Sequence, residues 1–262
     1  MVELFELLQY VPLAWTLAAG ALLIAGAAEL GCRVGLRAYR RGAAPSDVGT
    51  LAAAALGLLA LLVAFSFSMA VDRFNSRRSA VLEEANAIGS TANFALMLPR
   101  ETQAPILGEL RDYTRIRIGL GRPYDPDKMA RDIARSIELQ GQLWRQAMAA
   151  TEASPQSLPV YRFVGSLNEV NNVHERRLTA LRNHVPFAVM GMLVLTAMVA
   201  MGFTGYTEGI TGARRQGANI LMAITIAALI CLIIDLNRPY RGLIQISPQA
   251  LIDTADNLPK GG

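Results

Sequence analysis

Histidine and cysteine are scarce in this chain of 262 residues, which has two of each. His174 and His184 are ten residues apart, so they point to different faces or turns of a helix, and no His/Glu or Cys/His spacing fits a zinc site. We interpret both as surface or membrane-rim histidines. Cys32 and Cys231 are interpreted as small apolar residues in packed helices. The sequence therefore predicts no metal site and no cofactor.

The sequence patterns of catalysis and of nucleic-acid binding are also missing. There is no glycine-rich phosphate loop beside a strand and no Gly-x-Ser-x-Gly turn. Glu83 and Glu84 are adjacent and face different directions on a helix, which favours solvated or bundle-pairing carboxylates over an acid/base pair. The net charge of +4 is spread over small arginine clusters and forms no basic stripe. We predict neither an enzyme nor a nucleic-acid partner.

Charge itself is missing from four long stretches, which are residues 7–28, 48–71, 183–207 and 216–234. Each is near or above the ~20 apolar residues that an α-helix needs to cross the hydrocarbon of a bilayer. Helices satisfy their own backbone hydrogen bonds there. The first ten residues contain Glu3 and Glu6 and no Lys or Arg, the reverse of a signal peptide, so we interpret the first stretch as a retained span. The sequence predicts an all-α membrane protein with four transmembrane helices.

The spans form a 2+2 layout around a long polar middle. The first span is expected from Val11 to Gly31, followed by a short loop, Cys32 to Asp47. From Val48 no proline occurs until Pro99, so the second span is expected to continue as one long helix outside the bilayer. We expect four segments: residues 1–71 with spans one and two, an extramembrane bundle 72–185, residues 186–236 with spans three and four, and a tail 237–262.

The middle segment has the pattern of a helical bundle. Helices are expected over residues 104–118, then from a cap at Asp127 to a break at residues 154–159. A last helix from Val160 is expected to run into span three, with a tolerable kink at Pro186. The prolines of the tail predict an irregular or only briefly helical segment.

Arginines near the spans give two answers about orientation. The short loops, residues 32–47 and 207–216, hold six arginines, and the positive-inside rule then places the bundle outside the cell. The bundle side holds eight arginines near the membrane, which favours the reverse on a bare count. These are Arg73, Arg77, Arg78, Arg176, Arg177, Arg182, Arg238 and Arg241.

The second span has a four-residue repeat of apolar or small residues, Gly57, Leu61, Phe65 and Met69, on one helix face. This face can pack against another helix, with Gly57 allowing close approach. It can also form the wall of a pore, where bulky apolar side chains gate by dewetting. Beyond it lie three basic residues that could concentrate anions at a pore mouth or contact lipid headgroups, namely Arg73, Arg77 and Arg78.

The end of the fourth span carries a polar turn. Asp235 closes the span and is followed by Asn237, Arg238, Pro239, Tyr240 and Arg241. An acid at this depth beside two arginines indicates a local ion pair or a folded turn. A structural anchor is favoured over an ion site.

Two of these segments together resemble the bestrophin-like family of bacterial four-span membrane proteins. They are residues 69–87, MAVDRFNSRRSAVLEEANA, and residues 235–242, DLNRPYRG. The likeness to bestrophin channels is more remote. Their second span is followed by an Arg-aromatic-aromatic motif, of which Arg73-Phe74-Asn75 matches two positions. Their fourth span precedes an acidic-Pro-Phe-Gly turn, to which Pro239-Tyr240 is a loose match. The acidic run of calcium-activated members is absent here.

The resemblance implies a homopentamer with a central anion pore and a cytosolic bundle. Aligning Arg73 with the motif arginine sets Phe65, Leu61 and Gly57 on the three neck positions of the pore, where Gly57 departs from the bulky pattern. The implied orientation conflicts with the short-loop charge.

We expect an oligomeric, anion-conducting membrane channel of the bacterial inner membrane with the second span lining the pore. Its partners would be the lipid bilayer, further copies of the chain and small anions. The alternative is a membrane-anchored sensory or scaffolding protein whose bundle binds a partner or ligand. We recognise no signalling output domain in the sequence, so this alternative is less favoured than the channel. Uncharged span interiors argue against ion-coupled transport.

Overall fold

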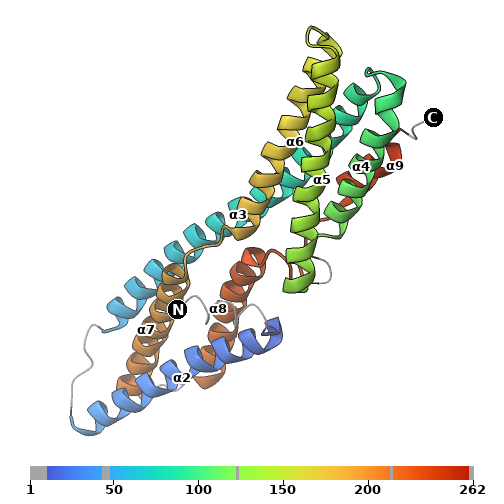
Figure 1. Cartoon of the computed structure of the whole chain (residues 1–262). Coiled ribbons are helices and arrows are strands. Elements are labelled where there is room, and N and C mark those ends of the chain that lie inside the picture. The colour runs from blue at the N-terminus through green and yellow to red at the C-terminus, as the bar shows by residue number, and fades with distance from the viewer. Residues whose placement is uncertain (1–10, 43–47, 122–123, 213–214, 260–262) are drawn as a thin grey trace. The chain divides into compact units, whose positions relative to one another are not determined.

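The structure, a computed structural model, describes residues 11–42, 48–121, 124–212 and 215–259. These residues form helices and no strand (Figure 1). The helices are α2 (Leu13–Arg40), α3 (Val48–Ala95), α4 (Arg100–Gly119), α5 (Pro126–Ala153), α6 (Leu158–Arg182), α7 (Phe187–Thr211), α8 (Gln216–Asn237) and α9 (Gln249–Asn257).

Four helices are long and apolar enough to cross a membrane: α2, the first half of α3, α7 and α8. Between the second and third of them the chain forms α4, α5 and α6. The chain is therefore an all-α, multi-pass membrane protein with spans in a 2+2 layout and a helical bundle between spans two and three, as predicted. The absence of proline after Val48 has the expected result, because α3 continues without a break to Ala95.

By its internal contacts the chain divides into two compact units. The membrane unit contains Met1–Arg73 and His184–Ile244, and the bundle unit contains Phe74–Asn183 and Gln245–Gly262. The tail contributes the short helix α9 to the bundle unit, where Leu251 and Leu258 are buried. The hydroxyl of Thr254 also donates a hydrogen bond to the carbonyl of Ala85 over 3.4 Å.

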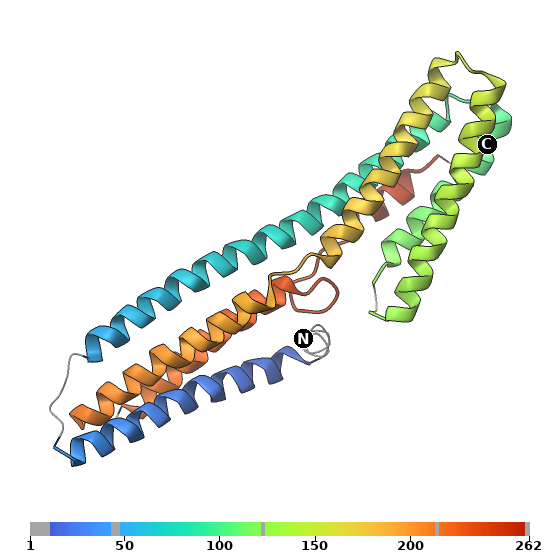
Figure 2. The ribbon, with the colours of Figure 1, turned by 60° about the vertical axis from the view of Figure 1, so that its left-hand side comes forward.

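In the membrane unit, α2 and α7 pack side by side at backbone contact (Figures 1 and 2). The glycines at the crossing come in pairs spaced by four residues, Gly31 and Gly35 on α2 and Gly205 and Gly209 on α7. A methyl group added to any of them would overlap a backbone carbonyl of the other helix. Inside lipid no hydrophobic effect draws helices together, so van der Waals packing at such close approach drives their association. This contact was not predicted from the sequence.

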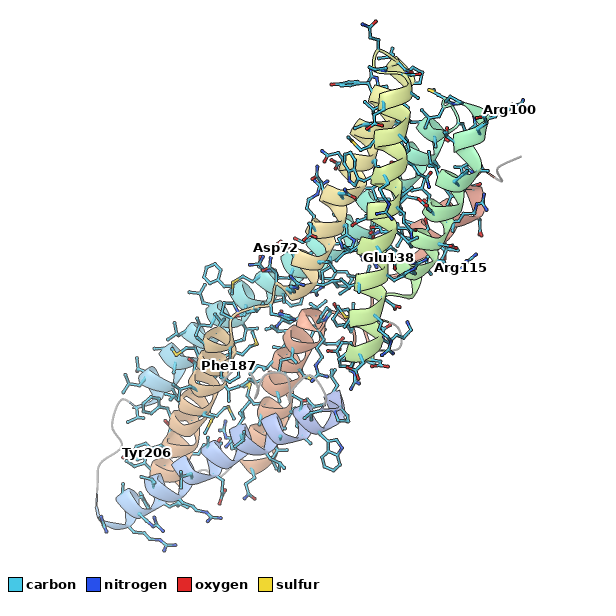
Figure 3. All side chains as sticks on the ribbon, in the orientation of Figure 1. Asp72, Arg100, Arg115, Glu138, Phe187 and Tyr206 are labelled. Atoms are coloured by element: carbon cyan, nitrogen blue, oxygen red, sulfur yellow. The ribbon has the colours of Figure 1, made fainter. Side chains whose placement is uncertain are left out.

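The bundle unit has a core of aliphatic and aromatic side chains from α3, α4, α5, α6 and α9. Leu107, Leu143 and Phe163 are at most 1% exposed. Charged side chains such as Arg115 and Glu138, labelled in Figure 3, lie on its surface. The bundle is thus an ordinary water-facing helical domain with its own core.

Three boundary predictions were wrong. The loop expected from Cys32 begins later: α2 continues to Arg40, and basic residues such as Arg37 and Arg40 are favourable at a helix C-terminus. The cap of α5 is Asp125, whose carboxylate accepts the backbone N–H groups of Asp127 at 3.0 Å and Lys128 at 3.2 Å. Helix α6 does not run into α7, because residues 183–186 interrupt them.

Some predicted features lie outside the described residues. They are the acidic N-terminus within residues 1–10, the loop residues 43–47 and Arg214. The two cysteines are described, and both Cys32 and Cys231 are buried in their helices, in agreement with the interpretation as packed apolar residues.

Candidate functional site

The predicted face of the second span is exposed along its whole length. Leu61 is 53% exposed, Phe65 60% and Met69 37%, and the face begins at Gly57, which has open space beside it. In a water-soluble protein such a row of bare apolar side chains would be costly. In a membrane protein it contacts lipid, another subunit or a dewetted pore.

The rest of α3 has a clear inward side. Ala52, Leu59 and Ser66 are buried and recur every seven residues, which is two helix turns. The same spacing continues from Arg77 to Glu84 in the bundle unit, where both side chains are also buried. Within each unit α3 therefore buries one stripe, and among the described residues the Gly57–Met69 face is left exposed.

The three basic residues after this face have different surroundings. Arg73 and Arg78 are exposed, whereas Arg77 is only 2% exposed. Of these three arginines, Arg73 and Arg78 are the ones whose guanidiniums a dissolved ion can reach.

The polar turn after the fourth span is folded around Asp235. Its carboxylate accepts the backbone N–H groups of Leu243 and Ile244, both at 3.0 Å. A side chain at Gly242, whose φ is +147°, would collide with the same carboxylate. The side-chain amide oxygen (Oδ1) of Asn237 accepts a hydrogen bond from the backbone N–H of Val185 at 2.8 Å, which ties the end of α8 to the start of the third span. Pro239, Tyr240 and Arg241 lie within the loop that Asp235 closes.

The bundle unit contains a buried ion-pair cluster centred on Glu84, which we call the Glu84 cluster. The Nε of Arg117 lies 2.6 Å from the Glu84 carboxylate, and Arg177 pairs with its other oxygen. Arg177 also donates to the backbone carbonyl of Arg117 at 3.1 Å. One carboxylate thus meets two guanidiniums from α4 and α6, so that three helices are joined by charge-assisted hydrogen bonds.

Tyr113 and His174 complete the Glu84 cluster. The Tyr113 hydroxyl donates to Glu84 at 2.9 Å and lies 3.1 Å from Nδ1 of His174. Because the hydroxyl has one proton and the carboxylate is the stronger acceptor, Nδ1 of His174 must donate to the Tyr113 oxygen. His174 is then the neutral Nδ1–H tautomer. Its Nε2 has no hydrogen-bond partner among the described residues.

The charges of the cluster shift its acid–base groups. Burial and the nearby Arg117 guanidinium lower the pKa of His174 to about 4. Burial alone would raise the pKa of Glu84, but Arg117 and Arg177 hold it below its usual value. At neutral pH the cluster therefore contains one carboxylate, two guanidiniums and a neutral imidazole.

The interpretation of His174 as a surface residue was wrong, since it is 1% exposed. A signal for its burial was present. On α6 the buried positions Val160, Phe163, Leu167 and Val170 follow alternating steps of three and four residues, and the next two steps reach His174 and Arg177. His184, by contrast, is half-buried.

A family model described as the Bestrophin-like domain matches residues 18–251. No curated protein sequence matches the chain.

Solved structures of a bacterial bestrophin homologue from Klebsiella pneumoniae share the fold. One, phased on zinc, has a TM-score of 0.65 at 14% identity, covering 95% of this chain and 100% of that one. Two variants of that homologue give TM-scores of 0.69 and 0.70 at 13% and 15% identity, covering 95% and 93% of this chain and 100% and 96% of theirs. The likeness extends over nearly the whole of both chains.

Proposed function

Because the chain belongs to the Bestrophin-like family, we propose that it forms an oligomeric, anion-conducting channel whose pore is lined by the membrane half of α3. The observation that carries the proposal is the exposed apolar face of α3, from Gly57 to Met69. No helix among the described residues covers this face, and in the proposed channel equivalent helices of other copies surround the pore with it.

The proposal requires several copies of the chain. Four spans of one subunit hardly enclose a water-filled path, whereas identical heterologous interfaces close into a ring. The family likeness favours five copies. In such a ring Leu61 and Phe65 form an apolar constriction, and Gly57 leaves the end of this neck wider.

Ion choice follows from charge in the same proposal. Arg73 and Arg78 are exposed beyond the apolar face and would repeat around a ring as a positively charged zone. A zone of one charge sign raises the local concentration of the opposite ion. Small anions are therefore the proposed substrates, and the uncharged interior of the span passes them without binding them tightly.

We place the channel in the bacterial inner membrane with the bundle in the cytosol, as the family likeness implies. The arginines of the short loops favour the opposite orientation. Residues of the bundle surface would in either case face water, and the Glu84 cluster would hold the extension of α3 to α4 and α6.

Electrical recording from purified full-length protein in planar bilayers tests the proposal. Unitary currents that reverse near the chloride equilibrium potential in a chloride gradient are expected. Light scattering corrected for detergent should give a closed oligomer. A strict monomer or dimer, or a reconstituted oligomer that conducts no ion, would contradict it.

A further inference from the structure

A large apolar groove lies in the membrane unit, between α2, α7 and the first turn of α3. It measures ≈860 Å³ and is lined by fifteen residues, none of them charged. Its lining includes Leu23, Leu30 and Phe203, and Gly26 and Gly202 contribute bare backbone. The groove exists because α2 and α7 approach at glycines, which leaves no side chains to fill the space beside the crossing.

The depth of the groove fits a hydrocarbon ligand. Most of its lining comes from the uncharged stretches of the first and third spans, which lie at the level of lipid chains. Tyr206 on α7, labelled in Figure 3, has the only polar side-chain atom of the lining. An occupant here needs no hydrogen bonds and gains contact with apolar walls.

Basic residues continue the groove side of α2 toward the membrane surface. Arg37 follows Leu30 by seven residues and Arg41 follows Val34 by seven, which is about two helix turns, so both lie on the groove face or just past its end. Both side chains are exposed. Two helix turns correspond to roughly 10 Å, the step from the hydrocarbon to the headgroup region.

We propose that this groove binds an anionic phospholipid, with an acyl chain between α2 and α7 and the phosphate at Arg37 and Arg41. The chemistry of the groove asks for a ligand with an apolar chain and an anionic head at one end. The inference goes beyond channel activity and does not rest on it.

A second copy of the chain would complement the charge of Arg37 and Arg41 less well than a lipid phosphate does. On this side of the membrane the described residues contain two carboxylates, Glu29 and Glu208. Glu29 pairs with Arg33 at 2.8 Å. Glu208 accepts the N–H of Arg215 at 3.2 Å and the side-chain amide of Asn219 at 2.8 Å. Both acids are already engaged within their own chain, whereas a lipid phosphate brings its own negative charge.

The test is native mass spectrometry of the full-length protein released from micelles with added phosphatidylglycerol or with phosphatidylcholine of the same acyl chains. The wild type should retain more phosphatidylglycerol than phosphatidylcholine. Arg37→Gln combined with Arg41→Gln should lower its retention about tenfold, since each guanidinium–phosphate hydrogen bond is charge-assisted. Arg33→Gln is the matched control, because Arg33 is already paired with Glu29.

A second pair of variants tests the groove itself. Gly26→Leu places an isobutyl side chain in the groove, and nothing lies within 4 Å of its Cβ. Gly191→Leu on α7 has the same open surroundings but does not line the groove. Gly26→Leu should reduce retention of phosphatidylglycerol several-fold and Gly191→Leu should leave it unchanged.

Three results would overturn the proposal. Equal retention of the two lipids by the wild type would remove the anionic site, and an equal loss in Arg33→Gln would reduce the effect to general surface charge. Photocrosslinking of a benzophenone side chain placed at Leu30 to a second copy of the chain would show that another subunit covers the groove.

Discussion

Glu84 and Arg117 form an ion pair from which water is excluded: their side chains are 0% exposed and the atoms that join them are 2.6 Å apart. Removing one partner of a buried pair leaves an uncompensated charge, at a cost of about 3–5 kcal/mol. Removal of the Glu84 carboxylate would leave the guanidiniums of Arg117 and Arg177 buried without their counter-charge. The pair therefore stabilises the bundle only while both of its partners are present.

We expect Glu84→Gln to lower the stability of the bundle by about 3–5 kcal/mol, measured by denaturation of the full-length protein in detergent and followed by circular dichroism. Its neighbour supplies the control. Glu83 is 46% exposed and lies 3.6 Å from Arg176, so Glu83→Gln should cost under about 1 kcal/mol. Equal effects of the two substitutions would show that the Glu84 cluster does not stabilise the bundle.

The stability of the protein should depend on pH because of His174. Its pKa is about 4 in the folded protein and about 6.5 in a free histidine, so between these values the unfolded chain binds the proton and the folded chain does not. Stability must then fall as pH drops from about 6.5 toward 4. The lowered pKa of Glu84 makes its own stabilisation disappear at lower pH, below about 4.5.

The measurement compares melting temperatures of the wild type and His174→Gln between pH 7 and pH 4.5. The wild type should lose more stability over this range than the variant. The raised pKa of Glu109 acts in the opposite direction, and it cancels because both proteins contain it. Parallel curves would contradict a buried neutral His174.

The α2–α7 crossing predicts a sharp difference between two glycines of α7. A methyl group at Gly205 would overlap the carbonyl of Ala28, whereas Gly191 has nothing within 4 Å. Gly205→Ala should therefore force the helices apart and lower the melting temperature. Gly191→Ala should leave it unchanged or raise it, since alanine favours helix by about 1 kcal/mol. Similar melting temperatures would show that the helices can separate without cost.

The sequence predicted those features that depend on local composition. Four charge-free runs set the number of spans, and the lack of proline between Val48 and Pro99 set the length of α3. Features that depend on a distant partner were missed. The glycines of α2 and α7 are visible in the sequence, but which pair meets is decided by packing. His174 fits the buried stripe of α6, yet only Glu84 and Arg117 on other helices explain why a polar residue is there.

Orientation can be tested with single cysteines in a background lacking Cys32 and Cys231. Ser154 follows α5 in the bundle, and Thr211 ends α7 at the opposite end of the third span; both are exposed. If the bundle is cytosolic, an impermeant thiol reagent on whole cells should label Thr211→Cys and not Ser154→Cys. Labelling of Ser154→Cys alone would place the bundle outside, as the short-loop charge favours.

Phe65 and Phe67 provide the sharpest test of the pore face. The two rings are two residues apart on α3, so they point to different sides of the helix, and both are exposed, by 60% and 39%. If Phe65 lines a dewetting constriction, Phe65→Ala should widen it and raise the unitary conductance, and Leu61→Ala should act in the same direction. Phe67→Ala removes the same volume from another face and should leave the conductance unchanged. Arg73→Glu should in turn reduce the preference for anions over cations, measured from reversal potentials, because it inverts the charge beyond the constriction. An assembled Phe65→Ala protein that conducts no better than the wild type, or a Phe67→Ala protein that matches its gain, would place the pore on a side of α3 other than the Gly57–Met69 face.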